Sequence, residues 1–242
     1  MKKIQVLFAF AVVLLTHNVN AQKERAVWSK EKANEWYKQY SWLRGCDFIP
    51  HTAINQLEMW QKETFDTTAI NTDLSYAESI GLNCMRVFLH HAAWEIDPGG
   101  FKQRMKDYLT IAQRHGIVTL FVFFDDCWNE TYHTGLQPAP KPGIHNSGWL
   151  RDPGKLLYDD PSLVNLLEKY VKDILATFKN DKRILLWDVY NEPGNSNYGN
   201  KSLPLLQKIF SWGREVNPGQ PLSAGIWTTK FNYIKRLPVS QQ

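Results

Sequence analysis

The most chemically informative segment of the chain is Trp187-Asp188-Val189-Tyr190-Asn191-Glu192-Pro193. Its apolar beginning predicts a strand, and Pro193 marks the point where the chain turns outward, so Glu192 is expected at the strand's end. Cleavage of a glycosidic bond requires one carboxylic acid to protonate the leaving oxygen and a second carboxylate as nucleophile or base. Glu192 is therefore a candidate acid held rigidly in place. The alternative is a solvated glutamate that begins a helix before Pro193.

A second candidate is Arg86, which lies in the apolar run from Asn83 to Leu89. A buried charge is costly unless it meets an opposite charge. Arg86 is therefore expected to contact a carboxylate, either within a site or in a structural ion pair elsewhere.

Polar and aromatic side chains follow the predicted strands where each strand ends. The candidate substrate contacts are His90, Trp94, Asp126, Trp128 and Trp227, with His91 and Asp125 beside them. Tryptophan rings suit the apolar faces of sugars, but His90 and His91 could equally be solvated, and Trp94 and Trp128 could pack under loops.

The elements that must position these residues follow a repeated pattern: an amphipathic helix, a glycine or turn, and then a short apolar run. Helices are predicted from an Asp66 cap to Gly81, from Phe101 to Gly116, from Leu163 to Phe178 and from Leu205 to Val216. The strands after them are predicted at 83–89, 117–124, 184–190 and 222–227, with an earlier helix around Trp36 to Tyr40 and an earlier strand at 42–49.

This alternation is typical of a parallel α/β fold, either a barrel or an open doubly wound sheet. No glycine-rich phosphate loop follows the first predicted strand, which disfavours a nucleotide-binding open sheet. A barrel of eight units takes about 250 residues, whereas we count about five strands, and 231–242 would at most begin the next helix. We therefore expect an α/β fold of the (β/α)8 TIM barrel type, truncated after about five strands. The proline-rich segment 129–161 is expected at the rim where barrel active sites are built.

The motifs and their places on the strands resemble the clan of retaining glycoside hydrolases with cellulase-like barrels, similar to glycoside hydrolase family 5. Members carry an Asn-Glu pair, often followed by Pro, at the end of the fourth strand, which matches Asn191-Glu192-Pro193. The resemblance implies that Glu192 is the acid/base, that Asn191 hydrogen-bonds the hydroxyl next to the cleaved bond, and that Arg86 contacts the nucleophile. It places that nucleophile after the seventh strand, beyond Gln242. The chain departs from the family after the third strand, where Asp125-Asp126-Cys127 stands in place of a usual histidine.

The first 21 residues read as a signal peptide: Lys2 and Lys3, an apolar run, and a cleavage site after Ala21. Residues 22–242 would then form one secreted or periplasmic barrel domain without a membrane span. The formal net charge is +4, and the basic residues do not cluster along the sequence. No nucleic-acid partner is therefore expected. The cysteines Cys46, Cys84 and Cys127 lack metal spacing, and neither a metal nor a cofactor is expected. Their disulfide state and the oligomeric state are left open.

These features favour a secreted glycoside hydrolase that cleaves β-glycosidic bonds by a retaining two-carboxylate mechanism, with carbohydrate as its partner and the nucleophile outside this chain. A catalytically inactive carbohydrate-binding protein on the same barrel is the alternative. A serine hydrolase is disfavoured because no Gly-x-Ser-x-Gly elbow occurs.

Overall fold

The computed structural model describes residues 27–160 and 162–228. Within these residues, one sheet contains five parallel strands in chain order: β1 (Gly45–Asp47), β2 (Cys84–Phe88), β3 (Val118–Val122), β4 (Ile184–Asn191) and β5 (Leu222–Gly225). Because the strands are parallel, their carboxyl ends meet at one edge of the sheet, and the side chains that follow each strand gather there.

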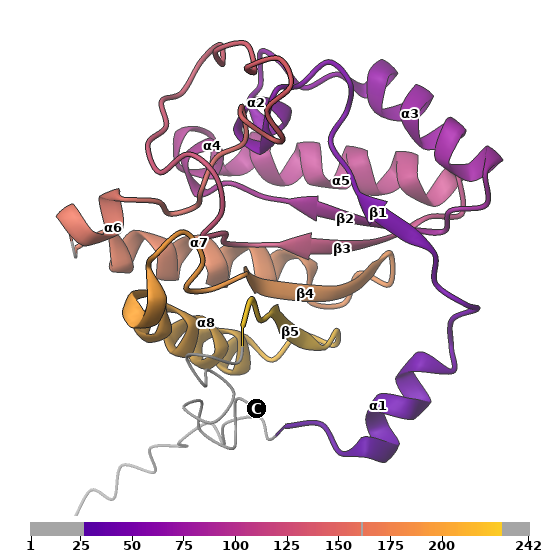
Figure 1. Ribbon diagram of the computed structural model, residues 1–242. Helices are drawn as coiled ribbons and strands as arrows, with labels where there is room; N and C mark the ends of the chain where they lie inside the picture. The colour runs from indigo at the N-terminus through magenta and orange to yellow at the C-terminus, as the bar shows by residue number, and fades with distance from the viewer. Residues whose placement is uncertain (1–26, 161, 229–242) are drawn as a thin grey trace, which may run out of the picture.

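Helices connect the strands, and the longer ones cover one face of the sheet. They are α1 (Lys30–Tyr37), α2 (Gln56–Trp60), α3 (Thr67–Ser79), α4 (His91–Ile96), α5 (Pro98–Arg114), α6 (Leu156–Asp159), α7 (Leu163–Phe178), the 3₁₀ helix η1 (Gly199–Ser202) and α8 (Leu203–Val216). Figure 1 shows α5, α7 and α8 along the sheet, while α1 stands apart from it. None of the described helices is long and apolar enough to cross a membrane.

Local sequence signals explain where the longer helices begin and end. The Asp66 side chain accepts hydrogen bonds from the backbone N–H groups of Thr68 and Ala69, which caps α3. Asp97 caps α5 through the N–H of Gly100, and proline occupies the first position of that helix. Gly116 follows α5 with a φ of +66°, a left-handed conformation that glycine adopts without strain.

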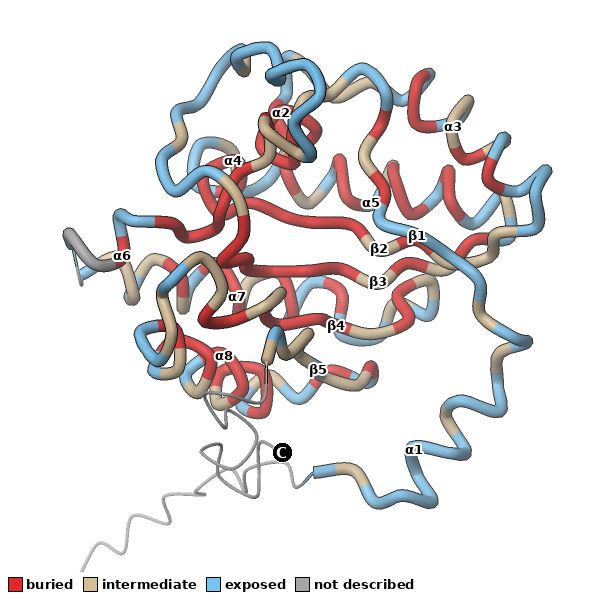
Figure 2. Tube along the Cα trace, in the orientation of Figure 1, coloured by how far each residue is buried: buried red, intermediate tan, exposed pale blue. Residues whose placement is uncertain are grey.

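The core between the sheet and the helices is aromatic. The fully buried Trp187 of β4 stacks against Phe121 and Phe123, with ring centroids 5.7 and 5.4 Å apart. Tyr170 of α7 meets Phe123 edge to face at 5.5 Å. These contacts fix β4, and therefore the residues at its end, against β3 and α7. Figure 2 shows the central strands and the facing sides of α5 and α7 as buried.

The opposite face of the sheet is only half covered. Along β2 and β3, Met85, Val87 and Phe121 are buried against the helices, whereas Cys84, Arg86 and Leu120 on the other face are half-buried. In a closed barrel this second face lines the interior.

The predicted pattern of elements is confirmed. The helix predicted from Leu163 to Phe178 has the bounds of α7. Four of the five predicted strands contain the observed ones, and β4 runs one residue beyond its predicted end, to Asn191. The short helices α2, α4 and α6 were not predicted, because they lie in connections too short for a periodic pattern. The segment 129–160 does follow β3 at the carboxyl edge, where Asp152 pairs with Asp125 and Leu150 with Asn129. The signal peptide and the segment 231–242 lie outside the described residues.

Candidate active site

Arg86 forms the centre of the polar network at the carboxyl edge of the sheet. Its Nη2 donates to Asp188 Oδ2 at 2.5 Å and to Asn191 Oδ1 at 2.8 Å, and its Nε reaches the same Asp188 oxygen at 3.2 Å. Nη1 lies 3.3 Å from Asp47 Oδ1, because β1 and β2 pair with Asp47 opposite Arg86. The predicted carboxylate partner of Arg86 is therefore Asp188, with Asp47 as a second and more exposed one.

An irregularity in β4 makes this arrangement possible. Side chains three residues apart on a regular strand point to opposite faces of the sheet. The pairing of β4 with β5 shifts register between Asp188 and Asn191, so that Asp188 lies opposite Ser223 while Asn191 lies opposite Gly225. Asp188 and Asn191 can both reach Arg86 because of this local change in register.

Asn191 links Arg86 to the end of β3. Its Nδ2 donates to Asp125 Oδ1 at 2.8 Å and lies 3.6 Å from the sulfur of Cys127. The same Asp125 oxygen accepts the backbone N–H of Cys127 at 2.8 Å. Both polar groups of the Asn191 amide are thus engaged within the protein, which fixes the orientation of the side chain.

Glu192 follows directly and is half-buried. Its backbone N–H donates to Gly225 O at 2.7 Å, and its φ of +46° is uncommon for a residue with a side chain. Its Oε2 accepts a hydrogen bond from Asn195 Nδ2 at 2.6 Å and lies 3.1 Å from the Cys127 sulfur. Strained backbone held by surrounding contacts is frequent at functional sites. Glu192 is thus fixed at the strand end.

Burial shapes the charges of this network. It raises the pKa of Asp125 to about 7, despite the hydrogen bonds from Asn191 and Cys127. Burial also raises the pKa of Asp188, which the guanidinium of Arg86 partly offsets. The pKa of the Cys127 thiol is raised by burial and by the nearby carboxylates of Asp125 and Glu192, so the thiol keeps its proton. The site therefore holds one permanent cation, Arg86, among several acids.

The raised pKa of Asp125 predicts a pH-dependent stability. Below about pH 4, Asp125 is protonated in both the folded and the unfolded protein. Between about pH 4 and pH 7 its carboxyl group ionises only in the unfolded chain. The free energy of unfolding therefore falls as the pH rises through this range. Asp125→Asn keeps the shape and removes this loss. We expect the free energy of unfolding of this variant, relative to that of the wild type, to increase by up to about 4 kcal/mol as the pH rises from about 4 to 8.

Urea denaturation at several pH values measures this difference. Asp107→Asn at the solvent-accessible surface of α5 is the matched control and should show little of the effect. A difference between Asp125→Asn and wild type that stays constant with pH would contradict the prediction.

His90 and His91 are both buried, not solvated. Asp152 accepts a hydrogen bond from the backbone N–H of His91 at 2.7 Å and pairs with its Nδ1, while Tyr132 Oη lies 2.9 Å from His91 Nε2. Burial lowers the pKa of His90 to about 4, so this ring is neutral. His90, His91 and Asp152 lie close enough to offer three metal ligands, but both ring nitrogens of His91 already have protein partners.

The predicted substrate contacts are not all brought together. Trp94 is buried against Tyr170, and its indole N–H donates to Asp173 at 2.8 Å. Asp126 is buried and accepts hydrogen bonds from Tyr190 Oη, from the backbone N–H of Gly194 and from Ser202. These contacts give Trp94 a packing position and let Asp126 hold the loop after Glu192. His90, with no exposed surface, cannot touch a sugar without a change in conformation.

Trp128 and Trp227 remain open to solvent, as sugar contacts require. Trp227 is 52% exposed just after β5, and Trp128 is half-buried beside His145 and Trp149. Trp149, far along the loop after β3, was not among the predicted substrate contacts. The only sign of it was its place in a segment expected at the rim.

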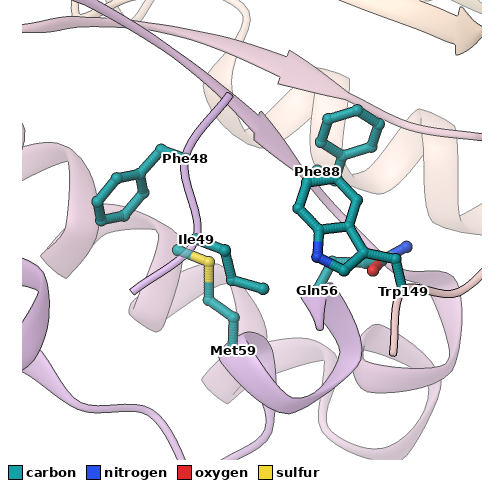
Figure 3. A pocket seen from close by; sticks show the side chains of 6 residues that line it. All are labelled: Phe48, Ile49, Gln56, Met59, Phe88 and Trp149. Carbon is teal, nitrogen blue, oxygen red and sulfur yellow. The ribbon is translucent and has the colours of Figure 1, made fainter. Parts of the chain in front are cut away.

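Trp149 helps to form a small apolar pocket near the ends of β1 and β2. Figure 3 shows its indole beside the ring of Phe88, with Gln56 next to the indole and Ile49 and Met59 at the other side. The pocket is small, with a volume of about 10 Å³. Gln56 donates to Leu150 O at 2.5 Å, while its buried Oε1 has no hydrogen-bond partner among the described residues. The pocket thus combines aromatic walls with one open acceptor.

No protein-family model matches the chain. Among proteins of known activity, mannan endo-1,4-beta-mannosidase from Mytilus edulis is 27% identical over 208 residues, which is 70% of this chain. The match covers 51% of the relative, so the chain spans about half the length of that enzyme.

Solved structures share the arrangement of strands and helices. The beta-mannanase of the blue mussel Mytilus edulis superposes with a TM-score of 0.51 at 17% identity, covering 76% of this chain and 59% of that one. The exo-beta-1,4-mannosidase of Opitutaceae bacterium strain TAV5 gives a TM-score of 0.56 at 17% identity, covering 84% of this chain and 34% of that one. The chain has the fold of the cellulase-like barrel glycoside hydrolases. The resemblance found in the sequence and the expected α/β barrel architecture are thereby confirmed.

Proposed function

We propose that this chain carries the acid/base half of a secreted, retaining β-glycoside hydrolase. The observation that carries the proposal is Glu192: a half-buried carboxylate at the end of the fourth parallel strand, with one oxygen engaged by protein groups and Asn191 and Arg86 beside it. A rigid, partly exposed acid at the carboxyl edge of a barrel sheet is the arrangement that proton transfer to a leaving group needs.

The proposed reaction has two steps, and Glu192 regains in the second step the proton that it gives up in the first. In the first, the nucleophile forms a bond to the anomeric carbon while the glycosidic C–O bond breaks and Glu192 gives its proton to the leaving oxygen. In the second, Glu192 takes a proton from water as that water attacks the same carbon and releases the nucleophile. The family resemblance puts the nucleophile after a seventh strand, in residues that these 242 do not include.

Arg86 and Asn191 support this site in different ways. Arg86 supplies positive charge that partly offsets the raised pKa of the buried Asp188, and it orients the Asn191 amide. Asn191 Nδ2 gives one hydrogen to Asp125 and directs the other at the weak acceptor Cys127 Sγ, 3.6 Å away. We propose that this second hydrogen is donated instead to the sugar hydroxyl next to the cleaved bond when substrate is bound.

For the substrate we propose β-1,4-linked mannan or its oligosaccharides, since the relative and the structural neighbours act on β-mannosidic bonds according to their names. Trp128, Trp149 and Trp227 would supply aromatic surfaces for sugar rings. The N-terminal segment with its cleavage site after Ala21 would direct export.

The test is hydrolysis of soluble β-mannan and mannotetraose by the longest gene product that contains these residues, with cellulose and xylan oligosaccharides as comparison substrates. We expect turnover of the mannan substrates, with the β-configuration retained in the first product, as monitored by NMR. The 242 residues expressed alone should give no turnover, because retaining hydrolysis needs a second carboxylate about 5 Å from the first. Mannan binding without turnover by the longest product would favour the carbohydrate-binding alternative.

A further inference from the structure

The side chains of Cys127 and Asn195 meet Glu192 on one of its two oxygens. Asn195 Nδ2 lies 2.6 Å and Cys127 Sγ 3.1 Å from Oε2, and Asn195 Nδ2 is also 3.2 Å from the sulfur. Within the described residues, no hydrogen bond reaches the other oxygen, Oε1. The carboxyl group therefore has one oxygen held inside the protein and one that is free for a substrate.

Both neighbours are hydrogen-bond donors toward Oε2. The Asn195 amide nitrogen carries two hydrogens, and its Oδ1 is occupied by the backbone N–H of Ser196, which fixes the orientation of the amide. Cys127 is buried, and burial together with the carboxylates of Asp125 and Glu192 keeps the sulfur protonated. Its single S–H can therefore point to the Glu192 oxygen.

Two donors on one oxygen decide where a carboxylic acid carries its own proton. An oxygen that accepts an N–H and an S–H has its lone pairs occupied, so the acid proton belongs on the other oxygen. We infer that Cys127 and Asn195 are positioning residues that hold Oε2 of Glu192 as an acceptor and so place the catalytic proton on Oε1. The inference rests on the proposed role of Glu192 as acid/base.

The backbone around both residues supports this assignment. The N–H of Cys127 donates to Asp125 Oδ1 at 2.8 Å, and the N–H of Asn195 donates to Glu192 O at 3.0 Å. Cys127 stands directly after Asp125-Asp126 at the end of β3, so the thiol is held at the same edge of the sheet as Glu192. A thiol is a weak donor, which orients the carboxyl group without binding its charged form strongly.

The experiment compares two substrates in the longest gene product. Mannotetraose has a poor leaving group that needs the proton, whereas dinitrophenyl β-mannobioside has a leaving group that departs without it. We expect Cys127→Ala and Asn195→Ala to lower kcat/KM on mannotetraose by about 10-fold to 100-fold, within the range that proton donation contributes. On the dinitrophenyl substrate kcat/KM should stay nearly unchanged.

Isosteric variants sharpen the comparison. Asn195→Asp places an acceptor where the donor stood, so the acid proton is drawn to Oε2, and this variant should lose more activity on mannotetraose than Asn195→Ala. Cys127→Ser keeps a donor and should retain most activity. Cys46→Ala on β1 and Asn165→Ala on the exposed side of α7 are matched controls with wild-type values on both substrates.

Equal losses on the two substrates, or an Asn195→Asp variant better than Asn195→Ala, would overturn the inference. A measurement independent of activity separates it from the proposed function: the infrared S–H stretching band of Cys127, assigned by its loss in Cys127→Ser. In Glu192→Ala we expect this band to move to higher frequency because the hydrogen bond is gone. If the wild-type enzyme hydrolyses neither substrate, the proposed function fails, and an unshifted band shows that the thiol does not donate to Glu192.

Discussion

Glu192→Gln is expected to lower kcat/KM on mannotetraose by about 100-fold to 10,000-fold, the range that a positioned general acid contributes. Glutamine has nearly the same shape as glutamate, and its amide oxygen can still accept from Asn195 and Cys127, so the fold around β4 should be preserved. What is lost is the proton for the leaving oxygen.

The measurement is steady-state hydrolysis of mannotetraose and of dinitrophenyl β-mannobioside by the longest gene product. The dinitrophenyl substrate should keep most of its kcat/KM, because its leaving group departs without a proton. Glu63→Gln, at an exposed glutamate before α3, is the matched control. Turnover of mannotetraose close to the wild-type value would remove Glu192 from the mechanism.

Arg86→Met is expected to lower the free energy of unfolding by about 3 kcal/mol or more, the cost of leaving one partner of a buried ion pair alone. The side chain of Asp188 is 7% exposed, and without Arg86 its carboxylate would keep only the backbone N–H groups of Tyr190 and Gly225. If Arg86 contacted the nucleophile, as the family resemblance implies, its loss would be expected to damage catalysis more than folding. Because Arg86 instead forms a buried ion pair with Asp188, its loss is also expected to lower the stability of the fold strongly.

A second substitution tests that cause. Arg86→Met combined with Asp188→Asn removes the unpaired charge and should regain much of the lost stability in urea denaturation near pH 7. Lys172→Met, which breaks an ion pair with Glu168 and Glu215 at the surface, should cost no more than about 1 kcal/mol. A double variant as unstable as Arg86→Met alone would show that the buried charge of Asp188 is not the reason.

The order of helices and strands could be predicted from local sequence because it depends on local periodicity. The spacing of apolar residues between Leu163 and Phe178 allows only a helix with one buried face, and Asp66 and Gly116 mark helix ends by capping and by left-handed backbone. The same logic puts Glu192 at a strand end, since the apolar run stops there and proline follows. A carboxylate partner for Arg86 could also be predicted locally, because a charge among apolar neighbours is costly unless it is paired.

The partners of these residues depend on the tertiary structure. Asp188 reaches Arg86 only because β4 shifts its register against β5, which no pattern within β4 reveals. Cys127 and Asn195 are 68 residues apart and meet because two parallel strands end at the same edge. The burial of His90 and Trp94 likewise depends on the packing of α7 and the loop around Asp152, and that of Asp126 on the segment after Glu192. Sequence determined which residues stand at the strand ends, whereas strand register and loop packing decided which of them touch Glu192, because those contacts join segments with no common local pattern.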